Sequence, residues 1–375
     1  MTTLSDLVTP ALVLDRGVLD QNLAMMQARA DRLGVVHRPH LKTAKSVAVA
    51  NRLAGVPGRP VCVSTIEEAA YFFAGGFADL CCPNVVVPAK IRPFAALARR
   101  GATITLAVAD PATVGALAET AAAEGVELRV LVEVESGAAR TGLPPDSPRL
   151  LETAGAIHAA PRLTLAGIMT YGGQGYAARS REELCRIAAL ERDIAVGAAA
   201  RLRAAGLPCP TVSVGATPTS THADDLTGVT EIRPGVYMFF DMMQVGLGVA
   251  KPEQLAVSVL ATVVFSDPDL GRIVVDAGAL ALSKDGGEAS PSGHGLVVGL
   301  SGETLAPGLR VGQLHQEHGI LAGATPALAA RLPAGSRVRI LPHHVCLTAA
   351  PYDRYHVVGG TEVVEVWDKL TGTYA

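Results

Sequence analysis

The sequence lacks the features that mark membrane proteins, nucleic-acid-binding proteins and secreted proteins. No uninterrupted apolar run reaches the roughly 18 residues that a membrane-spanning helix needs. The 32 basic and 35 acidic residues give a formal net charge of −3, which favours neither nucleic acid nor an anionic membrane as a partner. The opening residues MTTLSDLVTP have neither a basic start nor an apolar core, so they do not resemble a signal peptide.

Cysteine is also sparse, and its spacing argues against a disulfide framework. The 375 residues include six cysteines, of which Cys81 and Cys82 are adjacent and the others scattered. In so long a chain this pattern is typical of reduced thiols in a reducing compartment. We therefore expect a soluble, cytoplasmic protein that binds neither membranes nor nucleic acid.

Up to about residue 245 the sequence alternates regularly between short apolar segments and helical patterns. The first helical pattern follows Asp15 and ends before Gly34, a capping motif at Ser64–Glu67 starts another, and the longest runs from Arg179 to Ala205. The expected strands start at Val35, Val61, Asp79, Thr103, Leu128, Leu163, Thr211 and Thr230. Eight strands alternating with helices over about 235 residues predict a (β/α)8 barrel of the TIM type.

After Gly246 the pattern changes to apolar strands separated by Gly, Pro and Asp turns, with few helical stretches. These strands read LAVSVLATVVFS, RIVVDAG, GLVVGL, SRVRILP and TEVVEVW. Such a pattern predicts a second, mostly antiparallel domain. The predicted fold class is therefore α/β, with a (β/α)8 barrel domain at residues 10–245 and a β domain at residues 246–375 plus 1–9. The segment TPALVLD, before the first helix, also has strand composition and is compatible with the β domain.

Reactive side chains follow several of the predicted barrel strands directly. Active sites of such barrels lie at the C-terminal ends of the strands. The residues at these ends are Lys42 after the first strand, Arg140 after the fifth, Thr170, Tyr171 and Tyr176 after the sixth, Gly215–Thr219 after the seventh and Arg233–Tyr237 after the eighth. The last two loops are neighbours and contain glycine, so their backbone N–H groups can hold a phosphate. A lysine beside a phosphate site indicates pyridoxal 5′-phosphate, whose aldehyde forms a Schiff base with lysine.

Each of these residues also has a simpler interpretation. Taken alone, Lys42 and Lys45 would be solvated surface charges, Arg140 would pair with Glu135, and the glycine motifs would be turns. The coincidence of five features at one edge of one barrel favours a site over these alternatives. Between the two lysines we prefer Lys42, because Lys45 falls within the helix that we expect next.

At this point the sequence resembles a known family. The motifs RPHLKTAKS, VSTIEEAAYFFAGGFADL, ESGAARTGL, VSVGATPT, EIRPGVYMFFD and LPHHVCLT, spread from Thr9 to Trp367, look like those of D-serine dehydratases and D-threonine aldolases. These are pyridoxal phosphate enzymes with the alanine-racemase-like fold. The resemblance implies a (β/α)8 barrel, a C-terminal β domain, a homodimer with the site near its interface, and a D-amino acid substrate.

The resemblance also assigns contacts to the cofactor. It implies Lys42 as the Schiff-base lysine, Arg140 near the cofactor's phenolic oxygen and Arg233 facing the ring nitrogen. The remaining residues expected around the cofactor are Tyr176 and, near the phosphate, Gly215, Thr217, Gly235, Val236 and Tyr237.

The motif HHVC supplies a candidate metal site. His344 and Cys346 lie two residues apart and would point to the same side of an extended segment. Imidazole and thiolate are ligands that zinc prefers. A single His and Cys without further ligands, however, more often have a structural role. The resemblance implies a divalent metal here, held by His-x-Cys in dehydratase-like members and by His-x-Asp in aldolase-like ones. We therefore expect Zn²⁺, with Mn²⁺ or Mg²⁺ as alternatives.

The function implied is a lyase acting on β-hydroxy-D-amino acids. The first hypothesis is a dehydratase that converts D-serine or 3-hydroxy-D-aspartate to a 2-oxo acid and ammonia. The alternative is a D-threonine-type aldolase, and less favoured are a racemase without metal and a non-catalytic cofactor-binding protein. Ala44 stands where many relatives carry a histidine, which favours dehydration; Gln174 and His343 also depart from the family pattern.

Overall fold

The computed structural model describes residues 2–53, 59–287 and 290–372. The chain folds into two compact units. The first, here called the β unit, comprises Met1–Leu23, Thr43–Arg52 and Val236–Gly372. Among the described residues, the second, here called the barrel unit, comprises Ala24–Lys42 and Leu53–Gly235. Helix α1 (Arg16–Arg32) begins in the β unit and ends in the barrel unit.

The barrel unit is built on eight parallel strands. In the order in which they pair, they are β2 (Val36–His37), β9 (Glu231–Ile232), β8 (Thr211–Val214), β7 (Leu163–Met169), β6 (Leu128–Glu133), β5 (Thr103–Val108), β4 (Asp79–Val85) and β3 (Val61–Cys62). The two ends of this series meet where His40, beyond β2, forms a parallel bridge with Cys62. The predicted α/β fold class is confirmed, because every strand expected in the barrel is present.

Apolar runs explain why these segments form a buried sheet. In β5 and β6 nearly every side chain is buried, as expected for strands that are covered on both faces. Small and medium side chains from five neighbouring strands pack together inside: Cys62, Cys81, Ala107, Leu131, Ala166 and Met169.

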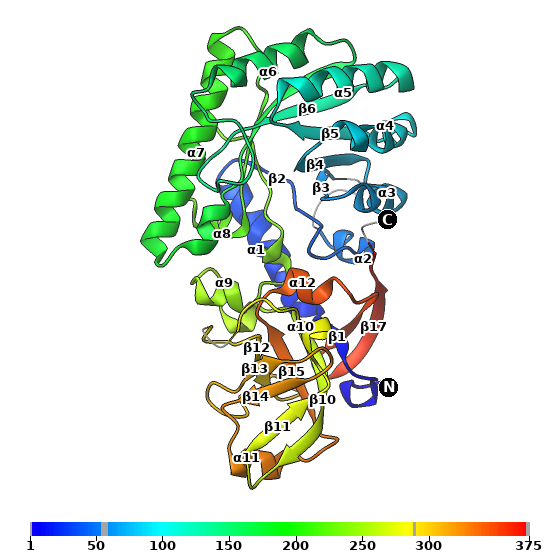
Figure 1. Cartoon of the computed structure of the whole chain (residues 1–375), viewed down its shortest axis with the longest axis vertical. Coiled ribbons are helices and arrows are strands. Elements are labelled where there is room, and N and C mark those ends of the chain that lie inside the picture. Colours follow the sequence, from blue (N-terminus) through cyan, green and yellow to red (C-terminus); the bar gives the residue numbers. More distant parts are fainter. Residues whose placement is uncertain (1, 54–58, 288–289, 373–375) are drawn as a thin grey trace. The chain divides into compact units, whose positions relative to one another are not determined.

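Helices cover the outside of the parallel sheet, as Figure 1 shows for α3 to α7. They are α3 (Ile66–Ala74), α4 (Ile91–Arg99), α5 (Pro111–Glu124), α6 (Pro148–Ala159), α7 (Arg181–Ala204) and the short α8 (Thr217–His222), with 3₁₀ turns at Pro88–Lys90 and Gly173–Ala177. Thr65 caps α3 by accepting the N–H of Glu68 at 3.2 Å. The capping motif predicted at Ser64–Glu67 is therefore wrong by one residue, because Thr65 and Glu68 play those parts.

The β unit contains a nine-stranded sheet. Its order is β11 (Arg272–Val275), β14 (Gly319–Ala322), β13 (Arg310–Leu314), β12 (Gly295–Val298), β15 (Arg337–Pro342), β10 (Val257–Asp267), β1 (Ala11–Asp15), β16 (Arg354–Gly359) and β17 (Glu362–Asp368). Because β10 also pairs with β11, the strands from β11 to β10 form a closed ring. The β1–β16 pair is parallel and the other pairs are antiparallel. The segment TPALVLD thus supplies a strand of this sheet.

Short helices complete the β unit. They are α2 (Val47–Ala50), α9 (Met242–Gly246), α10 (Ala279–Leu282), α11 (Pro326–Arg331) and α12 (Val345–Ala349), with 3₁₀ turns at Leu4–Asp6, Val236–Met238 and Pro252–Gln254. Lys45 lies in the irregular segment before α2 and has φ 49°. The expectation that Lys45 belongs to a helix is therefore wrong.

The division of the chain predicted at residues 245/246 stays a prediction. In the structure, Val236–Gly372 and Thr43–Arg52 both belong to the β unit, so the units divide at other positions. None of the helices in the described part of the chain is long and apolar enough to cross a membrane.

Candidate active site and metal centre

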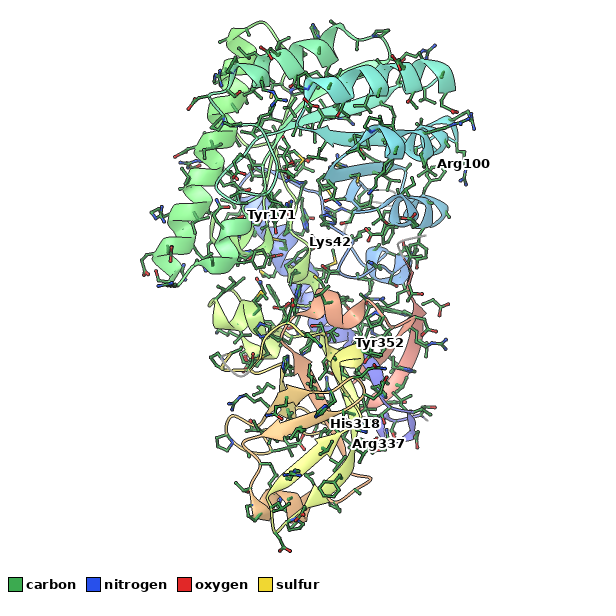
Figure 2. All side chains as sticks on the ribbon, viewed as in Figure 1. Lys42, Arg100, Tyr171, His318, Arg337 and Tyr352 are labelled. Carbon is green, nitrogen blue, oxygen red and sulfur yellow. The ribbon has the colours of Figure 1, made fainter. Side chains whose placement is uncertain are left out.

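Three of the predicted cationic residues surround one histidine at the mouth of the barrel. Lys42 follows the segment that continues β2, and its backbone N–H lies 3.4 Å from Nδ1 of His40 (Lys42 is labelled in Figure 2). Burial lowers the pKa of His40 well below its usual value, and the positive charges of Lys42, Arg233 and Arg140 lower it further. His40 is therefore a neutral imidazole within a cationic site, and sequence analysis had given it no role.

Arg140 lies in the loop after β6, where it stacks on an aromatic ring. Its guanidinium carbon is 4.2 Å from the ring centroid of Tyr171, a cation–π geometry, and Figure 2 marks this tyrosine after β7. Arg140 and Tyr171 line a narrow recess together with Glu133, Val134, Glu135, Ser136, Ala138 and Thr141. Glu135 accepts the backbone N–H of Ala139 at 3.1 Å, a bond that shapes this loop locally.

Arg233, after β9, is buried and held by two neighbours in the barrel. Its guanidinium donates to the hydroxyl of Ser213 and to the carbonyl of Thr170. The Ser213 hydroxyl in turn donates to the carboxylate of Glu231 at 2.6 Å, and Arg38 donates to the other oxygen of that carboxylate at 2.9 Å. This chain of charged hydrogen bonds fixes the direction of the Arg233 side chain.

A buried glutamate joins the loops that follow β7 and β8. Glu191 of α7 is 1% exposed, and its Oε1 accepts the N–H of Gly215 at 2.9 Å and the hydroxyl of Thr170 at 3.0 Å. Sequence analysis missed this residue. The signal was present, because Glu191 falls on the same helical face as Leu184, Ile187, Ala188, Ala195 and Ala198, all of them buried.

Close packing explains the glycine at 215. Its φ is +123°, and a Cβ there would lie 2.8 Å from Oγ of Ser220 and 3.1 Å from the backbone nitrogen of Arg233. The Ser220 hydroxyl is buried and has no hydrogen-bond partner among the described residues. Thr217 begins α8 in the same loop. A free hydroxyl beside a glycine turn that packs on the backbone of Arg233 fits a small ligand that carries a phosphate.

The other predicted cofactor residues lie in two places. Tyr176 lies in the 3₁₀ turn Gly173–Ala177, and Gly235 is the last residue of its segment in the barrel unit. Val236 and Tyr237 belong to the β unit, where both are buried. The role of these four residues at the cofactor stays a prediction.

The predicted metal ligands are in contact with each other within the β unit. The side chains of His344 and Cys346 hydrogen-bond to each other, and the Thr43 hydroxyl lies 3.2 Å from the Cys346 sulfur. Burial disfavours protonation of His344, but Cys346 and Asp285 outweigh it and raise the His344 pKa to about 9. The pair does not lie on an extended segment as expected: His344 is the residue just before α12, and Cys346 is inside that helix.

A buried aspartate holds the start of α12 in place. Asp241 accepts the backbone N–H groups of Val345 and Gln244, each at 3.0 Å. Burial raises the pKa of Asp241 to about 6, although both N–H bonds oppose that shift. Within the described residues, no set of three or more His, Cys, Asp or Glu side chains is arranged to hold a metal ion. His344 and Cys346 would therefore leave coordination positions for other ligands, as catalytic metal sites do.

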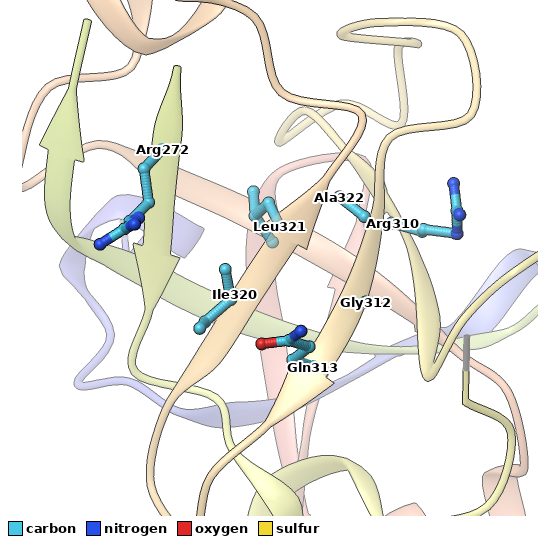
Figure 3. Close-up of a pocket in the computed structure, with 7 residues that line it drawn as sticks. All are labelled: Arg272, Arg310, Gly312, Gln313, Ile320, Leu321 and Ala322. Atoms are coloured by element: carbon cyan, nitrogen blue, oxygen red, sulfur yellow. The ribbon is translucent and has the colours of Figure 1, made fainter. Parts of the chain in front are cut away.

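A further cavity, of about 630 Å³, lies on the β unit and is shown in Figure 3. It is lined by Arg272, Arg310, Gly312, Gln313, Ile320, Leu321 and Ala322, from strands β11, β13 and β14. None of these is a predicted site residue, and the lining contains no nucleophile, acid or metal ligand. We therefore do not assign the reaction to it.

Comparison of the sequence with known proteins identifies the family of this chain. Residues 14–243 match the N-terminal domain of alanine racemase, and residues 256–358 match a putative serine dehydratase domain. The chain belongs to the alanine-racemase-like family. The resemblance inferred from the sequence motifs is thereby confirmed.

Relatives within the alanine-racemase-like family cover nearly the whole chain. D-threo-3-hydroxyaspartate dehydratase of Delftia sp. (strain HT23) is 41% identical, over 99% of both chains. Its solved structure superposes with a TM-score of 0.95 and covers 99% of this chain and 100% of that one. D-threonine aldolase of Arthrobacter sp. is 32% identical, over 96% of this chain and 91% of its own.

Other solved structures extend these comparisons. One is the metal-free form of a D-threo-3-hydroxyaspartate dehydratase variant in which a cysteine is replaced by alanine. Another is a variant of the same enzyme in which the histidine two residues before that cysteine is replaced by alanine. An alanine racemase from Corynebacterium glutamicum, 21% identical with a TM-score of 0.62, shares the fold.

Proposed function

We propose that this protein is a pyridoxal phosphate-dependent and divalent-metal-dependent lyase that dehydrates β-hydroxy-D-amino acids. The observation that carries the proposal is the 41% identity to D-threo-3-hydroxyaspartate dehydratase over 99% of the chain. The paired His344 and Cys346 side chains support it. The substrate class is 3-hydroxy-D-aspartate or D-serine, and the products are a 2-oxo acid and ammonia.

The barrel residues fit pyridoxal phosphate. Lys42 would hold the cofactor's aldehyde, Arg140 and Arg233 would face its anionic oxygen and its ring, and the Gly215 loop with Thr217 and Ser220 would take the phosphate. When bound, this cofactor stabilises negative charge on the α-carbon of an amino acid. Once the amino group of the substrate had displaced Lys42 from the aldehyde carbon, the freed Lys42 amine would remove the α-proton as a general base. Because His40 is neutral beside these cations, it offers a lone pair and adds no further positive charge.

His344 and Cys346 would hold a divalent cation, with zinc favoured by the sulfur ligand. A bound cation withdraws charge from a hydroxyl oxygen and so makes it a better leaving group. The protein supplies the ligands on a fixed element, since Asp241 anchors the start of α12. The imidazole and the thiol would each lose a proton to accommodate the metal.

Aldol cleavage of the same substrate class is the second candidate. It is favoured by the 32% identity to D-threonine aldolase of Arthrobacter sp. and by the same identity to 3-hydroxy-D-aspartate aldolase of Paracoccus denitrificans. Ala44 and Cys346 weigh against it, because the resemblance associates a histidine and an aspartate with aldolases at those two positions. Aldol cleavage would give glycine and an aldehyde in place of an oxo acid and ammonia.

We also infer a cytoplasmic homodimer that takes a free amino acid and neither nucleic acid nor membrane. The family resemblance supports the dimer. The free state of all six cysteines supports a reducing compartment.

Replacement of Lys42 tests the proposal. We expect Lys42→Ala to lose both the visible absorbance of the protein-bound cofactor and the release of ammonia from D-threo-3-hydroxyaspartate. The matched control is Lys45→Ala, which should keep both because Lys45 lies beyond the strand end, in the irregular segment before α2. Retention of the absorbance band in Lys42→Ala, or its loss in Lys45→Ala, would overturn the assignment of the lysine.

A further inference from the structure

One carboxylate that sequence analysis left without a role contacts the metal-ligand pair. We propose that Asp285 is a positioning residue that holds His344 in the tautomer needed to bind a divalent cation together with Cys346. This inference rests on the proposed function, because it concerns the same metal site. Asp285 acts through the histidine and is not itself a ligand in this proposal.

The tautomer follows from the hydrogen bond. Oδ2 of Asp285 lies 2.5 Å from Nδ1 of His344. An ionised carboxylate can only accept hydrogen bonds, so Nδ1 must carry a proton. The proton that His344 gives up to bind a metal is then the one on Nε2, and its loss leaves Nε2 with the lone pair through which histidine binds the metal. Without the carboxylate, the neutral ring would divide between two tautomers and several orientations.

The loop that carries Asp285 is held from both sides, so the contact is not a chance meeting of surface side chains. The Asp285 carbonyl accepts a hydrogen bond from Nδ1 of His294 at 3.1 Å, and its N–H donates to the Ser283 hydroxyl at 3.3 Å. Gly286, with φ +93°, follows directly, and a Cβ there would lie 2.9 Å from Cγ of His343. Only glycine permits this approach, which places the Asp285 carboxylate beside His344.

Exposure makes Asp285 a good site for mutation. Its side chain is 43% exposed, whereas that of His344 is 25% exposed. An exposed ion pair contributes little to stability, so removal of the carboxylate leaves folding intact. If the pair served stability alone, its loss would not alter metal affinity. A change in metal affinity without a change in fold therefore separates positioning from a structural role.

The test uses cobalt as the metal and the full-length protein with its cofactor. The variants are Asp285→Asn and Asp285→Ala, and the control is Asp353→Asn, an exposed aspartate of the β unit that pairs with Arg354. The Kd for Co²⁺ is measured by competition with a chromophoric chelator, and the sulfur-to-cobalt charge-transfer band reports Cys346. We expect both Asp285 variants to bind cobalt roughly 10–100-fold more weakly, while the band returns at saturation. The control should match the unmodified protein.

The outcomes separate this inference from the proposed function. Unchanged cobalt affinity in Asp285→Asn, while the unmodified protein shows the band, overturns the positioning role and leaves the metal site standing. Altered visible d–d bands of saturated Asp285→Ala would make Asp285 a ligand and would also overturn it. An unmodified protein that shows no sulfur-to-cobalt band overturns both this inference and the metal part of the proposed function.

Discussion

At the scale of single residues, Glu191 holds two loops of the barrel unit in place, and no motif in the sequence indicated this role. One buried carboxylate oxygen accepts hydrogen bonds from Thr170 and Gly215, which belong to the loops after two neighbouring strands. A Cβ at Gly172 would overlap the same carboxylate, so the first loop also packs on it. A residue of helix α7 therefore fixes the distance between the two loops.

Removal of this carboxylate should weaken both stability and cofactor binding. Glu191→Ala leaves the Gly215 N–H and the Thr170 hydroxyl buried without their acceptor, which costs about 1–3 kcal/mol for each group. Glu191→Gln keeps an acceptor oxygen and should lose less. Urea unfolding and a fluorescence titration with pyridoxal phosphate measure the two effects. The matched control is Glu182→Ala, an exposed position on the same helix; a Glu191→Ala variant that behaved like it would refute the role.

The reactive residues at strand ends could be predicted because barrel geometry assigns each strand end to one face. The strand-end positions of Lys42, Arg140 and Arg233 were predicted in this way, and all three charges lower the pKa of His40. Their roles at the cofactor stay predictions. Glu191 and Asp285 could not be found with the same rule. Their partners lie far away in sequence, and acidic side chains on a helix or in a turn are usually solvent-exposed.

At the scale of elements, helix α12 is fixed at both ends. Asp241 accepts the Val345 N–H at the start, and at the other end the ammonium of Lys369 donates to the carbonyls of Ala349 and Tyr352, each at 2.9 Å. Burial lowers the pKa of Lys369 to about 8. The helix that presents His344 and Cys346 thus depends on a lysine near the C-terminus.

Loss of that lysine should destabilise the β unit. In Lys369→Met the two carbonyls lose their donor, and we expect unfolding free energy to fall by about 1–3 kcal/mol. The control is Lys251→Met, an exposed lysine of the same unit. Chemical denaturation followed by circular dichroism measures the difference. Equal stability of the two variants would contradict the anchoring role.

Strands were predicted better in the barrel unit than in the β unit. The barrel strands are continuous apolar runs between helices, so each could be recognised in the sequence. In the β unit, β13, β14 and β16 were missed, because RVGQL, GILA and RYHVVG are short or mix apolar with polar and glycine residues. The helix at His344 was missed for a similar reason: five residues are too few for a helical period to show.

At the scale of the whole molecule, stability should depend on buried histidines. Burial of His37, together with the positive charge of Arg59, lowers the His37 pKa from 6.5 to about 3. Above the pKa that His37 has in the unfolded chain, its ring is neutral in both the folded and the unfolded state. Below that value the unfolded chain takes up a proton and the folded chain does not, so stability falls as pH decreases.

The predicted loss is about 1.4 kcal/mol per pH unit from His37, or about 2 kcal/mol between pH 6.5 and pH 5. His37→Asn should remove this part of the pH dependence, whereas His158→Asn, at an exposed position of α6, should not. Urea unfolding at a series of pH values checks this. Identical pH slopes for the unmodified protein and His37→Asn would show the prediction to be wrong.

The measurement that tests the central claim most directly is the identity of the products formed from D-threo-3-hydroxyaspartate by the cofactor- and metal-loaded protein. Dehydration predicts one oxaloacetate and one ammonia for each substrate consumed, and no glycine. Glycine and glyoxylate in equal amounts, or no turnover of this substrate and of D-serine, would contradict the account.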